Sequence, residues 1–223
     1  MKDYERSKRY DLAAALPLIA FYAWSVWRAV PGFRQYAEIL RQGHAEAPFI
    51  AATVARFSGI VFSALLIVLL LIRSVPVGKT KSLFPRATAV AGTFAVLAFL
   101  QLPRAELSFA QSIVSSVLIF SGIFLTVIAL LWLGRSFSIM PEARKLVTSG
   151  PYAIVRHPIY LFEEIAVVGF AMQFAWPWSP LLLTTHLVLQ VIRLHYEERV
   201  LMEAFPEYSA YAARTARLIP GIY

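Results

Sequence analysis

The chain has 223 residues, and its 59% hydrophobic and 15% charged content with a mean hydropathy of +0.64 excludes a water-soluble domain and indicates an integral membrane protein. The absence of cysteine excludes disulfides, thiolate metal sites and a cysteine nucleophile. The net charge of +8 comes from basic residues scattered between apolar runs, which favours membrane topology and anionic lipids over nucleic acid as its explanation.

Apolar runs long enough to cross a bilayer follow one another along the chain. A helix needs about 20 apolar residues to cross the hydrocarbon core. Four candidate spans meet or approach that length: Leu12–Val30, Phe49–Ile72, Ala87–Leu102 and Phe109–Leu133.

Two further apolar arms, Ile159–Ala175 and Leu181–Ile192, flank a segment with two tryptophans and two prolines. Proline breaks a helix and tryptophan favours the membrane interface, so these arms predict a helical hairpin. The second arm spans fully if its helix continues through Arg193–Tyr196. We therefore expect an all-α fold, a polytopic transmembrane helical bundle of five to six spans.

Basic residues indicate the orientation of this bundle. Most of the 21 Lys and Arg residues lie in the two tails and in the second and fourth connections, which six crossings place on one side. Cytoplasmic loops are enriched in Lys and Arg, so both termini are expected in the cytoplasm. In a bacterium the membrane would be the plasma (inner) membrane.

Small residues recur every four positions along the second span, at Ala51, Ala55, Gly59 and Ser63. Such a ridge lets another helix approach closely. The partner is either a helix of the same chain or a second copy in a homodimer.

Ionisable residues are sparse in the first four spans and frequent after Leu133. This asymmetry divides the chain into N-terminal transmembrane helices, residues 1–132, and a C-terminal region at the cytoplasmic face, residues 133–223, where we expect the functional site and, if the protein is an enzyme, the catalytic region. Pro158 is suited to the first turn of the fifth helix, with His157 at its cap, and the free amides there would attract an anion. Glu163 and Glu164 follow in that helix, where an ion pair with Arg135 or Arg156 is the structural alternative to a functional role.

Arg193 and Glu197 are one helical turn apart, and Glu198 adds a second carboxylate beside them. This charge cluster lies where an apolar helix leaves the membrane and is followed by Leu201, Phe205 and Tyr208. Charged groups facing apolar neighbours at that depth favour a functional site over a surface ion pair.

Four motifs in the last 90 or so residues occur in a characteristic order. They are Gly150-Pro151-Tyr152, Arg156-His157-Pro158-Ile159-Tyr160, the run from Glu197 to Leu201, and Phe205–Tyr211 followed by Ile219-Pro220-Gly221. In this order, behind several spans, they resemble the isoprenylcysteine carboxyl methyltransferase family of membrane enzymes.

The resemblance implies an enzyme that uses S-adenosylmethionine to methylate a lipophilic acceptor entering from the bilayer. Glu197 and Glu198 are then expected at the cofactor's ammonium or ribose. His157 and Tyr160 are expected at its carboxylate end, and Leu146, Val147 and Tyr152 at the adenine.

The chemistry of the acceptor decides the roles of the remaining residues. A carboxylate acceptor is already ionised at neutral pH, and Arg193 would orient it through a bidentate contact. An amine or thiol, from a phospholipid or a small molecule, requires a base, for which Glu163, Glu197 and His157 are the candidates. Carboxylate methylation is our main hypothesis. Neither a carboxylate acceptor nor an amine or thiol acceptor requires a metal.

Two functions of other classes compete with methyl transfer. His186 and His195 on one apolar segment suggest a non-catalytic protein that handles haem or a solute, although nine residues place them on opposite faces of a helix. A basic cytoplasmic face would also suit a membrane reductase that binds a nicotinamide cofactor.

Overall fold

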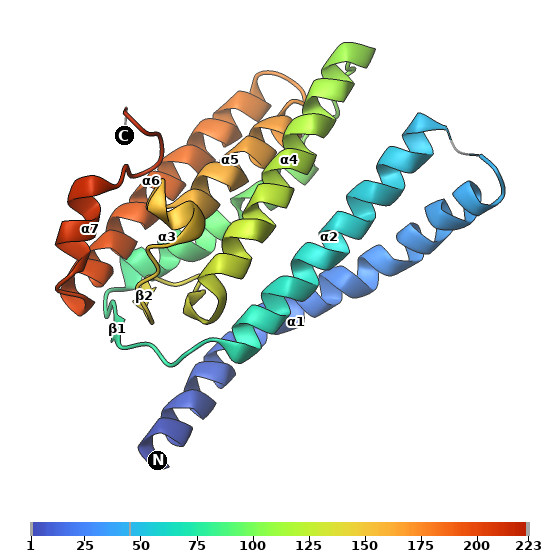
Figure 1. Ribbon diagram of the computed structural model, residues 1–223. Helices are drawn as coiled ribbons and strands as arrows, with labels where there is room; N and C mark the ends of the chain where they lie inside the picture. Colours follow the sequence, from blue (N-terminus) through green and yellow to red (C-terminus); the bar gives the residue numbers. More distant parts are fainter. Residues whose placement is uncertain (1, 45, 222–223) are drawn as a thin grey trace. The chain divides into compact units, whose positions relative to one another are not determined.

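The chain folds almost entirely into helices. The computed structural model describes residues 2–44 and 46–221, without the side chains of residues 2–6, 47, 48, 51 and 52. In chain order the helices and strands are α1 Lys2–Arg41, α2 Ala47–Ile72, β1 Gly78–Lys79, α3 Leu83–Phe94, η1 Ala95–Gln101, α4 Phe109–Leu133, η2 Gly134–Ser136, β2 Glu142–Ala143, η3 Gly150–Ala153, α5 Pro158–Ala171, α6 Trp178–Ala204 and α7 Tyr208–Arg214. The predicted helical class is confirmed (Figure 1).

Four helical segments in the described part of the chain are long and apolar enough to cross a membrane: Ser7–Arg41, Thr53–Ile72, Leu83–Gln101 and Phe109–Ser136. They overlap the first four predicted spans. α5 and α6 form the predicted hairpin, and α6 continues through Arg193 to Ala204. The hairpin is not among those four segments, so a fifth and sixth crossing and the cytoplasmic location of the termini stay predictions.

Two helices differ in extent from the predicted spans. α1 has 40 residues and contains Pro17 and Pro31, whereas the expected span ended at Val30. Apolar helices tolerate proline because neighbouring groups satisfy the freed backbone carbonyl. α3 begins at Leu83 rather than Ala87 and continues as the 3-10 helix η1.

The chain divides into two compact units, Met1–Val75 and Pro76–Tyr223. In the first unit, α1 and α2 are joined by a buried ion pair between Arg73 Nε and Asp11 Oδ2 at 2.9 Å. The second unit combines α3 and α4 with everything that follows. The expected boundary between residues 132 and 133 therefore remains a prediction about function, because α4 packs with the C-terminal region.

The small-residue ridge of the second span lies on α2. Ala55 is exposed, and a Cβ built at Gly59 has no described atom within 4 Å, whereas the side chain of Ala51 lies outside the described part. The described middle of the ridge therefore makes no close packing contact. A homodimer through Ala51, Ala55, Gly59 and Ser63 stays a prediction.

In the second unit, α4 and α5 pack closely through two glycines. A Cβ at Gly122 would lie 2.5 Å from the backbone nitrogen of Ala166, and one at Gly169 would lie 2.7 Å from the carbonyl oxygen of Ser115. The Ser115 hydroxyl donates to the Gly169 carbonyl oxygen at 2.7 Å. This contact fixes α5 beside α4 and thereby positions the start of α5.

Aromatic packing secures the other end of α5. Phe99 of η1 is fully buried against Val167, Ala171 and Phe174, and its ring centroid lies 5.8 Å from that of Phe174.

The β1–β2 ribbon lies against the C-terminal half of α6. It pairs Gly78 with Ala143 and contacts α6 at Val200 and Ala204. The C-terminal half of α6 is therefore enclosed by α3, the ribbon and α7.

Replacing Gly122 with Ala should destabilise the protein by about 1–3 kcal/mol, because the new methyl group meets backbone atoms of α5 that cannot move aside. Gly59→Ala is the matched control, since the same methyl group enters open space there. Thermal unfolding in detergent measures both. Equal unfolding temperatures of the two variants would contradict the close packing of α4 on α5.

Candidate functional site

The site is built around the start of α5. Pro158 occupies the first turn and His157 the cap position, as predicted, but the His157 side chain makes no capping hydrogen bond. Its imidazole Nε2 instead lies 3.2 Å from Glu198 Oε1 of α6. The first amides of α5 are therefore not capped by His157 and keep the capacity to bind an anion.

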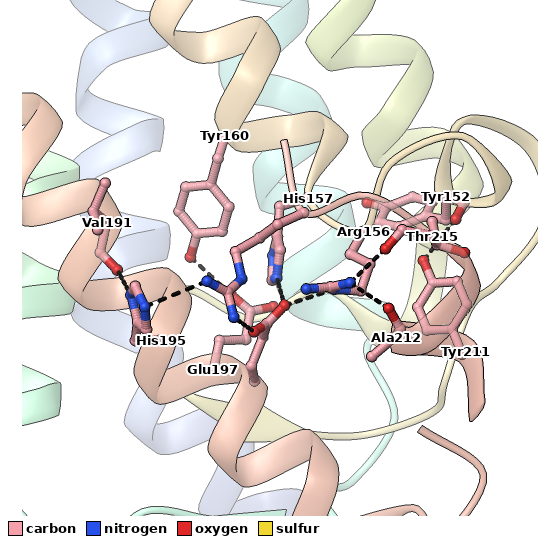
Figure 2. Close-up of polar contacts among 12 residues, drawn as sticks. Tyr152, Arg156, His157, Tyr160, Val191, His195, Glu197, Tyr211, Ala212 and Thr215 are labelled. Carbon is pink, nitrogen blue, oxygen red and sulfur yellow. Dashed lines mark hydrogen bonds and ion pairs between the residues drawn. The ribbon is translucent and has the colours of Figure 1, made fainter. Parts of the chain in front are cut away.

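Glu198 is the centre of an ionic cluster that joins three segments, which we call the Glu198 cluster. Arg156 Nε donates to Glu198 Oε1 at 2.7 Å, and Arg217 Nη2 lies 2.8 Å from Glu198 Oε2. Arg156 Nη1 also donates to the carbonyl oxygens of Ala212 and Thr215 (Figure 2). The cluster thus fastens the C-terminal segment against the loop that precedes α5.

The electrostatics of this cluster favour an ionised Glu198, which lies beyond the predicted arm Leu181–Ile192. Burial raises the pKa of the carboxyl group, but hydrogen bonds from His157, Arg156 and Arg217 outweigh burial and hold the pKa well below its ordinary value of 4.5. All of these partners belong to the chain itself. Glu198 therefore orients His157 and Arg156.

A row of polar side chains follows one face of α6: His186, Gln190, Arg193 and Glu197, which we call the polar row. Their spacing of four, three and four residues places them on a single helical face. Each faces a residue of α5 or a neighbour in the row. The row therefore runs along the inside of the hairpin.

The partners of the polar row come from α5 in antiparallel order. His186 Nδ1 lies 2.8 Å from Glu164 Oε1, and Gln190 Nε2 donates to Glu163 Oε2 at 3.2 Å. The Tyr160 hydroxyl donates to Glu197 Oε2 at 2.7 Å (Figure 2). The two Glu residues of α5 thus pair with α6, whereas an ion pair with Arg135 or Arg156 was the alternative from sequence.

Arg193 is the buried cation of the polar row, with a relative exposure of 7%. Its Nη1 donates to Gln190 Oε1 at 2.5 Å, and its guanidinium carbon lies 5.1 Å from the centre of the Tyr160 ring. Its buried Nε has no hydrogen-bond partner among the described residues. Arg193 therefore contacts Gln190 and Tyr160, whereas an ion pair with Glu197 was the structural alternative from sequence.

Space for Arg193 is provided by a glycine of α3. A Cβ at Gly92 would lie 2.7 Å from Arg193 Cδ and 3.4 Å from Gln190 Oε1. Any other residue at position 92 would displace the buried guanidinium. α3 thus contributes to the site through the absence of a side chain.

The loop between α4 and α5 carries the residues expected at the adenine. Tyr152 is buried and its carbonyl oxygen accepts from the Tyr211 hydroxyl at 2.6 Å, whereas Leu146 and Val147 are half-buried. Burial raises the pKa of the Tyr152 phenol well above its ordinary value, and the charge of Glu197 adds to the effect. Tyr152 is therefore a neutral residue at physiological pH.

Gly150 gives this loop its sharp turn. Its φ is +60°, in the left-handed region, and a Cβ there would lie 2.5 Å from the Trp132 ring. Both facts require glycine at this position. The turn sets Tyr152 against the end of α4, where its hydroxyl lies 3.4 Å from the carbonyl oxygen of Ala129.

The structure brings His157, Tyr160, Glu163, Arg193, Glu197 and Glu198 together along the two hairpin arms. Gln190, Glu164 with His186, Arg217 and Gly92 were not assigned a role in methyl transfer from sequence. The four-three-four spacing of the polar row is a signal that would have indicated the first two. No pattern in the sequence indicates Arg217 or Gly92, because they approach the site from other elements.

His186 and His195 face different surroundings, as helical geometry requires. His186 is buried beside Glu164, whereas His195 is exposed and its Nδ1 lies 2.7 Å from the Val191 carbonyl oxygen. Among the described residues, no three acidic or histidine side chains gather closely enough to hold a metal ion.

Comparison with known proteins places a family match over this site. Residues 107–208 match the family described as phospholipid methyltransferase. That range contains α4, the hairpin and every predicted site residue from Leu146 to Glu198. Over these residues the match supports the resemblance to membrane methyltransferases that the sequence motifs suggested.

Two curated relatives are similar over the same length. The chain is 33% identical over 102 residues to the cobalt-zinc-cadmium resistance protein CzcN of Cupriavidus metallidurans. It is 29% identical over 102 residues to the nickel-cobalt-cadmium resistance protein NccN of Alcaligenes xylosoxydans xylosoxydans. Each match covers 45% of this chain and 47% of the relative, so the chain spans about half the length of the relatives it matches.

Glu198→Gln should lower the stability of the protein at neutral pH by about 2–3 kcal/mol, because Arg156 and Arg217 lose a buried charged partner. The pKa of Glu198 is depressed in the folded state, so its stabilisation is present above pH 4.5 and is lost as the pH falls through the folded value. Unfolding measured between pH 7 and pH 3 should therefore show a steeper loss for the parent protein than for Glu198→Gln.

Glu203→Gln on the exposed side of α6 is the control for this pH series. It should follow the parent protein at every pH. A Glu198→Gln variant with an unchanged acid dependence would contradict the ionic role of Glu198.

Proposed function

We propose that this membrane protein is an S-adenosylmethionine-dependent methyltransferase that methylates a lipophilic acceptor entering from the bilayer. The acceptor group in this proposal is a carboxylate, as in isoprenylcysteine. The observation that carries the proposal is Arg193, a guanidinium buried beside the α5 start with an unpartnered Nε. A buried cation of this kind suits an anionic acceptor, because Arg binds carboxylates through two parallel hydrogen bonds.

The residues of the site fit the cofactor chemically. Glu197, whose described partner is the Tyr160 hydroxyl, would hold the ammonium or the ribose hydroxyls. The uncapped first amides of α5, with His157, would hold the carboxylate. Leu146, Val147 and Tyr152 would flank the adenine.

In this proposal Glu198 does not contact the cofactor, whereas the sequence predicted it at the cofactor's ammonium or ribose. Its two oxygens face Arg156, His157 and Arg217. It would support cofactor binding by holding His157 at the cap of α5. Its neighbour Glu197 points about 100° away around the helix and is the carboxylate available to the cofactor.

The bound cofactor would supply an electrophilic methyl group on a sulfonium. Transfer to a carboxylate oxygen would form an O–C bond and break the C–S bond, with the electron pair going to sulfur and without movement of a proton. Arg193 would orient the carboxylate for in-line attack, and Tyr160 and Gln190 would fix Arg193. The apolar hairpin arms would exclude water, so that positioning would supply most of the rate.

An amine acceptor is the second candidate, favoured by the phospholipid methyltransferase match. Methylation of an ammonium-bearing headgroup requires a base to take the proton from nitrogen. Glu163, in contact with Gln190 of the polar row, is the carboxylate placed for that role. The two candidates differ in whether Glu163 is needed for turnover.

Glu197→Gln should weaken binding of S-adenosylhomocysteine at least about tenfold, because a neutral amide no longer pairs with the cofactor's ammonium. Calorimetry on purified protein in detergent measures this. Glu203→Gln, an exposed carboxylate further along α6, should leave the affinity unchanged. Failure of the parent protein to bind either S-adenosylmethionine or S-adenosylhomocysteine would overturn the proposal. Preferential binding of a nicotinamide cofactor would favour a membrane reductase, and a Soret band would favour a haem-handling protein.

Arg193→Lys should retain S-adenosylhomocysteine binding but reduce methyl transfer about a hundredfold, because an ammonium cannot form the bidentate contact. The acceptor is found by mass spectrometry of lipid extracts incubated with isotopically labelled methyl donor. Glu163→Gln in the same assay separates the candidates: it should preserve transfer to a carboxylate and abolish transfer to an amine. Full transfer by Arg193→Lys would contradict the role of Arg193.

A further inference from the structure

We propose that a groove at the beginning of α4 binds the phosphodiester headgroup of a membrane phospholipid. The groove has a volume of about 330 Å³ and is lined by Arg104, Ala105, Leu107, Ser112, Ser115, Ser116 and Gln173. It belongs to none of the contacts of the candidate site. Its lining holds the guanidinium of Arg104, whose N–H groups are suited to phosphate oxygens. The hydroxyls of Ser112, Ser115 and Ser116 donate to backbone carbonyl oxygens and form the polar border of the groove.

The groove lies at the opposite end of α4 from the candidate site. Tyr152 of the site contacts the carbonyl oxygen of Ala129, and Ser112 of the groove is 17 residues earlier in the same helix, about 25 Å along its axis. The hydrocarbon core of a bilayer is about 30 Å thick. If α4 crosses the membrane, the groove therefore lies at the headgroups of the other face.

The hairpin turn also indicates that the groove lies at the depth of the lipid headgroups. The turn between α5 and α6 lies beside the beginning of α4 (Figure 1), and Trp176 in that turn is 81% exposed. Exposed tryptophan is characteristic of the membrane interface. The groove and Trp176 are connected through the turn, since Gln173 lines the groove.

Arg104 is held in place by backbone and side-chain contacts. The Ala105 amide donates to the Gln173 carbonyl oxygen at 3.0 Å, and the Ala175 amide donates to the Pro103 carbonyl oxygen at 2.9 Å. The guanidinium carbon lies 4.5 Å from the centre of the Phe174 ring, and Nη1 donates to Gln173 Oε1 at 3.0 Å. In the described part of the chain its remaining donors have no protein acceptor, so they are available to a phosphate.

An apolar surface continues from the groove along α4 and suits acyl chains. Phe109, Ile113, Val117 and Phe120 are exposed by 82%, 46%, 59% and 52%. Serine hydroxyls at Ser112 and Ser116 lie at the edge of this surface. A headgroup in the groove would thus place its acyl chains on α4, whereas a free phosphate would leave that surface unused.

The proposal is tested by native mass spectrometry of the full chain in detergent with short-chain phosphatidylglycerol. Diacylglycerol of the same chains and inorganic phosphate are the comparison ligands. Phosphatidylglycerol should bind at least about tenfold more tightly than either, because only it offers both the phosphate and the acyl chains. Equal binding of diacylglycerol or of inorganic phosphate would overturn the assignment to a phospholipid headgroup.

Arg104→Gln should weaken phosphatidylglycerol binding at least about tenfold. Ser112→Leu, which fills the groove without touching the contacts of Arg104, should weaken it similarly. Arg28→Gln is the matched control, because Arg28 is also exposed and also lies over an aromatic ring, at 5.8 Å from that of Trp24. Unchanged binding by Arg104→Gln, or by Ser112→Leu, would overturn the site, and neither result depends on methyl transfer.

Discussion

The polar row of α6 lies between two apolar helix arms, and the rest of the site depends on how its members are paired. An unpaired polar or charged group in such surroundings costs several kcal/mol. Pairing Glu164 with His186, Glu163 with Gln190 and Tyr160 with Glu197 requires α5 to run antiparallel to α6 in one register. A shift of α6 by one residue would turn all of these side chains away from α5. The pairs therefore specify the hairpin geometry as well as lining the site.

Glu197 and Glu198 are adjacent in the sequence but contact different partners, because adjacent residues point about 100° apart on a helix. Glu197 faces Tyr160 and the polar row, whereas Glu198 faces Arg156, His157 and Arg217. The Glu198 cluster also draws in the segment from Ala212 to Arg217, whose backbone accepts from Arg156 and pairs with the loop before α5. The end of the chain is thus part of the wall around the α5 cap. One carboxylate shapes the site and the other remains available within it.

Much of this arrangement could be predicted from sequence, and what could not has a physical reason. Apolar length predicts the first four spans, and Pro158 predicts where α5 begins, because both depend on local properties of the chain. Helical spacing also places Arg193 and Glu197 on one face, but it does not identify their partners: Tyr160 from α5 approaches Glu197, and Gln190 approaches Arg193. Tertiary partners compete with the local one, and sequence spacing does not contain them. Gly92 could not be predicted for the same reason, because it contributes only the space that it leaves for Arg193, about a hundred residues away.

α4 links the two ends of the second unit. Its C-terminal end supports the loop of Tyr152, and its N-terminal end forms the groove of Arg104. In the predicted topology, Arg104 is among the few basic residues away from the side rich in Lys and Arg, so the charge bias that explains most basic residues does not account for it. A contact with Gln173 and stacking on Phe174 occupy only part of the guanidinium. A phosphate at the membrane interface would complete its hydrogen bonding and would anchor the end of α4 that lies farthest from the candidate site.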